Sequence, residues 1–89
     1  MLELIKFGAE WCGPCKKVEP VLQQFIEANL CKVTIYDVDE HPEMAEKYHI
    51  QSIPAFVWLK DGVEVEKQFG VVSLGTLTST FDEFSKDTQ

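Results

Sequence analysis

The sequence predicts an α/β fold, with one mixed four-stranded sheet and helices on both of its faces. Short apolar runs typical of strands alternate with stretches of helical spacing, in the order β-α-β-α-β-β-α. A right-handed crossover makes the first two strands parallel. The last two strands are separated by Asp61-Gly62, a pair typical of a tight antiparallel turn. At 89 residues, we expect a single domain spanning 1–89.

The first predicted strand, residues 2–8, has a nearly continuous apolar run in which only Lys6 is out of place. Such a run indicates a central strand covered on both faces. The helical pattern that follows begins at Lys16, and its apolar positions fall on one face. They are Val18, Val21, Leu22, Phe25 and Ile26. Residues 32–38, rich in β-branched residues, predict a second strand parallel to the first.

A short helix is expected to open at Pro42, because proline suits the first turn. Its predicted inner residues are Met44, Ala45 and Tyr48. Residues 55–59 and 63–69 predict the hairpin, and the second of these strands carries the glutamates of a charged edge strand.

Ser73 is a candidate cap for the last helix. The residues expected to face inward from this helix are Leu74, Leu77, Phe81 and Phe84. Residues 85–89 predict a frayed polar tail.

The net charge of −7 disfavours binding to nucleic acid or to an anionic membrane surface. No apolar run approaches the ~20 residues of a membrane span, and Met1-Leu2-Glu3 lacks the features of a secretory signal. We therefore expect a cytoplasmic protein, and a monomer. Three cysteines in a reducing compartment fit a working redox pair plus one spare thiol better than a disulfide framework.

Cys12 and Cys15 are separated by two residues at a strand-to-helix junction, which is typical of a thiol–disulfide redox motif. The positive end of the helix dipole stabilises a thiolate there, so Cys12 is the expected nucleophile. Cys15 lies one turn inside the helix, close enough to close a small ring, and is the expected resolving thiol. Pro14 suits the first turn, and Gly13 keeps bulk away from an approaching substrate.

The run Trp11-Cys12-Gly13-Pro14-Cys15-Lys16 resembles the active site of the thioredoxin family. Further matches are Pro20, Asp39 with Pro42, Ile53-Pro54, Asp61-Gly62 and Gly70. The resemblance covers nearly the whole chain, although typical members carry an additional strand and helix before Leu2. It implies a thioredoxin-like fold, and a thiol–disulfide oxidoreductase that reduces protein disulfides by exchange through Cys12 and Cys15.

The resemblance also implies a binding platform. The Ile53-Pro54 bond is expected to be cis and to lie against the cysteines, where the backbone of Ile53 can pair with a substrate strand. Trp11, Gly70 and Val71 would form its apolar rim. No bound cofactor is expected besides the redox disulfide. Electrons would come from NADPH through a thioredoxin reductase, and ribonucleotide reductase is a plausible client.

Lys6 departs from the family pattern, in which a buried aspartate stands at the matching position beneath the resolving cysteine. Ile35 replaces the usual partner lysine, and Gly8 replaces a second tryptophan. Lys6 is therefore a third candidate catalytic residue. If it stays cationic near Cys15, it should stabilise the thiolate there, unless its long stem carries the ammonium out to water.

Three alternatives remain open at this stage. The short chain favours a glutathione-coupled, glutaredoxin-like enzyme, whereas Gly13-Pro14 and Trp11 oppose it. The same face could serve a protein-binding module in which redox chemistry is incidental. A zinc set would need Cys12, Cys15, Cys31 and His41. That ligand pattern is incomplete, so we expect no metal site, and we interpret Cys31 as a small buried core residue and His49 as a surface residue.

Overall fold

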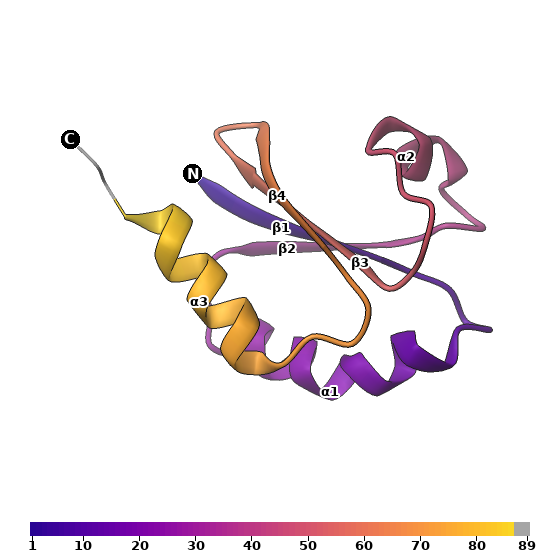
Figure 1. Ribbon diagram of the computed structural model, residues 1–89, viewed down its shortest axis with the longest axis horizontal. Coiled ribbons are helices and arrows are strands. Elements are labelled where there is room, and N and C mark those ends of the chain that lie inside the picture. Colours follow the sequence, from indigo (N-terminus) through magenta and orange to yellow (C-terminus); the bar gives the residue numbers. More distant parts are fainter. Residues whose placement is uncertain (87–89) are drawn as a thin grey trace.

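The computed structural model describes residues 1–86 and shows a sheet between two helical layers (Figure 1). The elements are β1 (Leu2–Gly8), α1 (Gly13–Glu27), β2 (Lys32–Asp37), α2 (Pro42–Lys47), β3 (Ala55–Lys60), β4 (Val63–Phe69) and α3 (Leu74–Ser85). This order confirms the predicted sequence of strands and helices. Of the predicted polar tail, Ser85 still closes α3, and residues 87–89 lie outside the described part of the chain.

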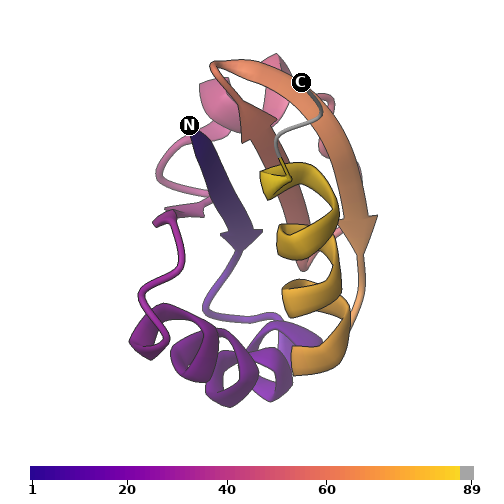
Figure 2. The ribbon, with the colours of Figure 1, turned by 90° about the vertical axis from the view of Figure 1, so that its left-hand side faces the viewer.

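The four strands lie in the order β2-β1-β3-β4. β1 runs parallel to β2 and antiparallel to β3, and β4 pairs with β3 as the outer strand of the hairpin. α1 and α3 cover one face of the sheet and α2 covers the other, as Figures 1 and 2 show. The prediction that β1 is central and covered on both faces is confirmed. No helix within residues 1–86 is long and apolar enough to span a membrane.

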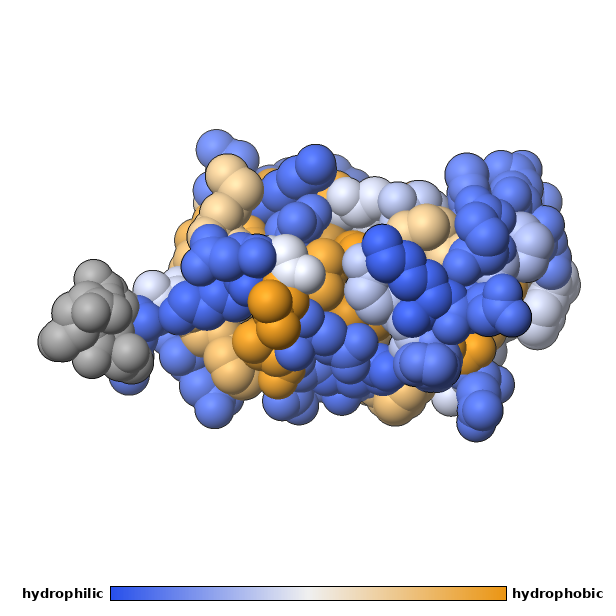
Figure 3. Space-filling model, turned by 90° about the horizontal axis from the view of Figure 1, so that it is seen from above, coloured by the Kyte–Doolittle hydropathy of each residue, from blue (hydrophilic) through white to orange (hydrophobic). Residues whose placement is uncertain are grey.

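Alternate residues of the central strands belong to two separate hydrophobic clusters, because successive side chains of a strand point to opposite faces. Leu4 and Trp58 pack toward α1 and α3, and Phe7 and Val57 pack toward α2. The predicted inner faces are confirmed: those of α1 and α3 line the first cluster and that of α2 lines the second. Seen from the α2 side, the surface is mostly hydrophilic, with apolar residues between the charged ones (Figure 3).

Four element boundaries differ from prediction: those of α1 and β2, the end of β3 at Lys60 instead of residue 59, and the end of α3 at Ser85. α1 begins at Gly13, three residues before the apolar pattern, because the Cys12 side chain accepts a hydrogen bond from the backbone N–H of Cys15 and caps the helix. β2 ends at Asp37, although the N–H of Val38 still donates to the carbonyl of Gly8 at 2.9 Å.

The edge strand β4 contains an irregularity that its sequence pattern does not reveal. Trp58 pairs with Glu66 whereas the next residue, Leu59, pairs with Glu64, so Val65 is an extra residue in the ladder. Only Val65 of the alternating apolar residues packs against a core cluster, and Val63 is exposed. The predicted edge position is confirmed, and the bulge makes that edge less regular for pairing with another chain.

A polar chain crosses from β3 through β4 to α3. The indole N–H of the fully buried Trp58 donates to Gln68 Oε1 at 3.0 Å, and Gln68 Nε2 donates to Thr80 Oγ1 at 2.9 Å. The Thr80 hydroxyl donates in turn to the carbonyl of Thr76 at 2.8 Å. Gln68 therefore satisfies the one polar group of the largest core side chain and ties the last helix to the sheet.

Replacing Gln68 by alanine should destabilise the protein by about 1–3 kcal/mol, because the buried indole N–H of Trp58 loses its acceptor. Urea unfolding measures the change. Gln24→Ala on the exposed face of α1 is the control and should change stability by less than about 0.5 kcal/mol. Equal stability of the two variants would show that the polar chain contributes nothing.

Candidate active site

The two cysteines of the motif lie where β1 passes into α1. They form a disulfide with Cα atoms 5.3 Å apart. Cys12 occupies the cap position, and its Sγ accepts the backbone N–H of Cys15 at 3.2 Å. Both are buried, Cys12 with 4% and Cys15 with 1% of its surface exposed. Gly13 and Pro14 occupy the first turn and are exposed, and no atom outside its immediate neighbours would touch a side chain at Gly13.

A second segment reaches this site from the start of β3. The Ile53–Pro54 peptide bond is cis, and Pro54 is fully buried. The carbonyl oxygen of Ile53 lies 3.9 Å from Cys12 Sγ. The carbonyl of Pro54 accepts the N–H of Gly70 at 2.8 Å, and Gly70 has φ +87°, a conformation that favours glycine. This bond holds the end of β4 against the Pro54 segment, so both candidate binding segments meet beside Cys12.

The apolar rim of the site is open to solvent. Trp11 is 70% exposed and Val71 is also exposed. The indole N–H of Trp11 donates to Asp39 Oδ2 at 2.8 Å, which fixes the ring across the loop after β2. Beside Trp11 lies a shallow pocket of about 160 Å³. Its other lining residues are Val38, Ala45, Ile50, Gln51, Ser52 and Ile53.

Asp39 is a site residue whose partner the sequence did not reveal. The family resemblance includes Asp39, but no spacing rule joins it to Trp11, 28 positions earlier in the chain. The pairing depends on how two loops at the same end of the sheet come together.

Lys6 lies on the α1 side of β1 with only 5% of its surface exposed, and it lines a small pocket. A Cβ built on Gly8 would lie 2.8 Å from Lys6 Nζ and 3.3 Å from Cys15 Sγ. The end of Lys6 therefore fills the space that a side chain at Gly8 would need, beside the buried sulfur. Burial lowers the pKa of Lys6, and the carboxylates of Glu19 and Asp37 oppose that shift.

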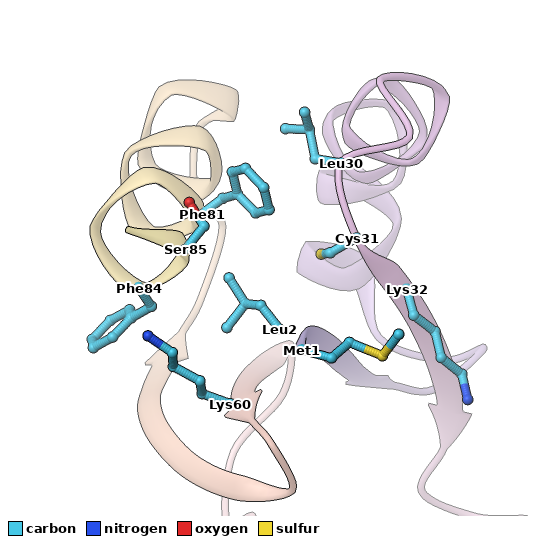
Figure 4. A pocket seen from close by; sticks show the side chains of 9 residues that line it. All are labelled: Met1, Leu2, Leu30, Cys31, Lys32, Lys60, Phe81, Phe84 and Ser85. Carbon is cyan, nitrogen blue, oxygen red and sulfur yellow. The ribbon is translucent and has the colours of Figure 1, made fainter. Parts of the chain in front are cut away.

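Cys31, predicted to be a small buried core residue, packs against the first hydrophobic cluster but is only partly buried. Its burial is partial because it precedes the edge strand β2 and points into a pocket of about 330 Å³ near Met1 and Phe81 (Figure 4). Burial, and to a lesser extent the charge of Glu3, raise the pKa of its thiol. His49 is exposed, as predicted.

The four residues of the alternative zinc site do not come together. β1 and β2 are parallel, so Cys31 at the start of β2 lies at the opposite end of the sheet from Cys12, which follows β1. Across residues 1–86, no group of three or more His, Cys, Asp and Glu side chains is arranged to hold a metal ion.

A disulfide between two cysteines at the start of a helix, following the central strand of such a sheet, defines a thiol–disulfide oxidoreductase of thioredoxin-like fold. Residues 1–83 match the thioredoxin family model. Thioredoxin of Chlamydia caviae is 42% identical over 86 residues, covering 94% of this chain and 83% of the relative. Thioredoxin of Chlamydia trachomatis serovar D is 50% identical over 72 residues, covering 79% and 70%.

Solved structures agree with these relatives. A mutant thioredoxin from Halobacterium salinarum superposes with a TM-score of 0.91 at 31% identity, covering 99% of this chain and 78% of that one. Fasciola hepatica thioredoxin superposes with a TM-score of 0.84 at 34% identity, covering 92% and 79%. The chain belongs to the thioredoxin family. Members of this family carry no cofactor beyond the redox-active disulfide, and they work with thioredoxin reductase and disulfide substrates.

Proposed function

We propose that this thioredoxin-family protein reduces protein disulfides in the cytosol, with Cys12 as the attacking thiol and Cys15 as the resolving thiol. The observation that carries this assignment is the cap geometry at Cys12, whose Sγ accepts the N–H of Cys15 at the positive end of α1. A thiolate gains from both the hydrogen bond and the helix dipole, so the pKa of the Cys12 thiol falls and its reactive form is populated near neutral pH.

The reaction takes two exchange steps. The Cys12 thiolate attacks a substrate disulfide, which forms a mixed disulfide and releases one substrate sulfur as thiolate. Cys15 then attacks Cys12 Sγ, so the Cys12–Cys15 bond forms while the bond to the substrate breaks. The substrate gains two electrons and the enzyme becomes the disulfide. Cys15 is almost fully buried, which favours attack on the neighbouring Cys12 over attack on a second substrate.

The substrate is best accommodated as an extended segment across Ile53 and the exposed rim of Trp11 and Val71. The carbonyl oxygen of Ile53 lies 3.9 Å from Cys12 Sγ. A hydrogen bond from the substrate backbone to the backbone of Ile53 would therefore hold the substrate disulfide over the attacking sulfur. Gly13 leaves the approach unobstructed. A protein client such as ribonucleotide reductase could present such a segment.

We expect electrons to arrive from NADPH through a thioredoxin reductase. Insulin-disulfide reduction should run at least about tenfold faster with reductase and NADPH than with glutathione and its own reductase at equal protein concentration, a difference of about 1.4 kcal/mol in barrier. Cys31→Ser should behave like the wild type, because Cys31 lies at the far end of the sheet. Preference for glutathione would instead support the glutaredoxin-like alternative.

The binding-module alternative has its own test. A variant with serine at positions 12 and 15 keeps the exposed rim but has no redox pair. Loss of biological activity in this variant, with retained folding, supports the reductase, whereas full biological activity would show that docking alone is the function.

A further inference from the structure

The side chain of Lys6 ends in a confined place beside the resolving sulfur. Residues i and i+2 of a strand share a face, so Lys6 and Gly8 lie on the α1 side of β1. Lys6 Nζ and Cys15 Sγ both lie within 3.3 Å of the point that a Cβ of Gly8 would occupy. An alanine at this position would be too close to Nζ, so the end of the lysine would have to shift.

Three carboxylates line the small pocket of about 150 Å³ that Lys6 also lines. Glu19 approaches from α1 and Asp37 from the end of β2, and both favour the ammonium form. Glu10 lines the same pocket. Among residues 1–86, none of these carboxylates forms an ion pair with Lys6 within 4.0 Å. In the disulfide state the amine of Lys6 therefore has no direct counter-charge.

We propose that Lys6 holds the proton of the resolving thiol, so that its ammonium and the Cys15 thiolate form a charge pair that exists only in the reduced protein. This inference rests on the proposed function, in which Cys15 resolves the mixed disulfide. It assigns to Lys6 a role opposite in charge to that of a carboxylate, because an ammonium favours the thiolate by attraction.

Reduction breaks the Cys12–Cys15 bond with two electrons, and the Cys15 sulfur becomes a thiolate while Lys6 takes up a proton. In the resolving step the Cys15 thiolate attacks Cys12 and loses its charge as the new bond forms. The departing substrate sulfur carries the negative charge away. Lys6 can then release its proton through the pocket lined by Glu10, Glu19 and Asp37, and that proton neutralises the substrate thiolate.

The sign of the pH effect follows from this pairing. In the disulfide state burial lowers the pKa of Lys6 below the ordinary lysine value. A thiolate 4–6 Å away raises a cation's pKa by about 1–3, so the pKa of Lys6 should be higher in the reduced protein. Between the two values reduction takes up one proton at Lys6 in place of the one that Cys15 would take up without the amine. Below the lower value Lys6 is charged in both states and Cys15 stays a thiolate, so the midpoint potential should fall less steeply with pH there than in Lys6→Met.

The experiment follows the Lys6 Cε signal by NMR through a pH titration of the oxidised and the reduced protein. We expect its midpoint to be at least about 1 pH unit higher after reduction. Lys17, exposed on α1, is the internal control, and its Cε signal should be the same in both states. The same Lys6 midpoint in both states overturns the inference. Failure of the wild-type protein to form the Cys12–Cys15 disulfide reversibly would instead overturn the proposed function.

Two variants test whether Lys6 changes the pKa of the Cys15 thiol, on which disulfide exchange depends. In Lys6→Met, which keeps the apolar stem, the pKa of the Cys15 thiol should rise by about 1, so the thiolate fraction near neutral pH falls about tenfold. Gly8→Ala should also raise the pKa of the Cys15 thiol, because the added Cβ displaces Lys6 Nζ. Gly8→Ala added to Lys6→Met should have little further effect. Gly75→Ala in α3 is the matched glycine control. Unchanged thiol titration in Lys6→Met overturns the inference.

Discussion

Replacing Cys12 by serine should reduce insulin-disulfide reduction at least about 1000-fold, because an alcohol at this position cannot supply the ionised nucleophile. The fold should survive, since serine can accept the same N–H of Cys15 that Cys12 Sγ accepts at 3.2 Å. Turnover with reductase and NADPH measures the loss, and thermal unfolding of both reduced proteins verifies folding.

The matching Cys15→Ser variant should fail differently. Cys12 can still attack, but no second thiol is placed to release the substrate, so mixed disulfides should accumulate through Cys12. Mass spectrometry after reaction with a disulfide peptide identifies the sulfur that carries the adduct. Cys31→Ser is the control and should retain wild-type turnover. If Cys12→Ser rather than Cys15→Ser traps the peptide, the roles of the two cysteines must be exchanged.

Phe25→Ala should be the most damaging single change to the fold, with a loss of about 3–5 kcal/mol. Phe25 is fully buried between α1 and the sheet, and its ring packs edge-on against Trp58 with centroids 5.8 Å apart. A domain of this size has a total stability of about 4–13 kcal/mol, so the variant should lose a large share of it. Urea unfolding of the oxidised proteins measures the change.

Phe69→Ala is the control for the size of the deletion. Phe69 is 49% exposed at the end of β4, so the same truncation should cost much less there than at Phe25. Equal losses at the two positions would mean that the core around Trp58 rearranges to fill the cavity.

Prediction from sequence succeeded where one local pattern determines the structure. The apolar run of β1 implied burial on two faces, and the Asp61-Gly62 pair implied the hairpin, where both residues have positive φ. Prediction failed where the local structure depends on a contact between residues far apart in the sequence. The bulge at Val65 depends on how β4 pairs with β3, and the hydrogen bond between Gln68 and Thr80 depends on how α3 packs against the sheet.

The candidate site divides in the same way. Spacing alone indicated Cys12 and Cys15, whereas Pro54 as a platform residue came from the family resemblance. The place of Lys6 beside Cys15 was expected, but its fit against Gly8 was not, although their separation by two positions in a strand could have indicated it. Glu19 follows Cys15 by four positions in α1, a spacing that places both on one helix face.

The positions of Met1 and of the last turn of α3 have a practical consequence for handling the protein. Met1 and Ser85 line the same pocket, at the end of the sheet where the N-terminal ammonium pairs with Asp61. Figure 1 places this end opposite the turn between β1 and α1, which carries the cysteines. A linker attached before Met1 or beyond α3 would therefore hold the protein at the end of the sheet opposite the cysteines. An immobilised or fused copy would present Cys12 outward, toward incoming substrates.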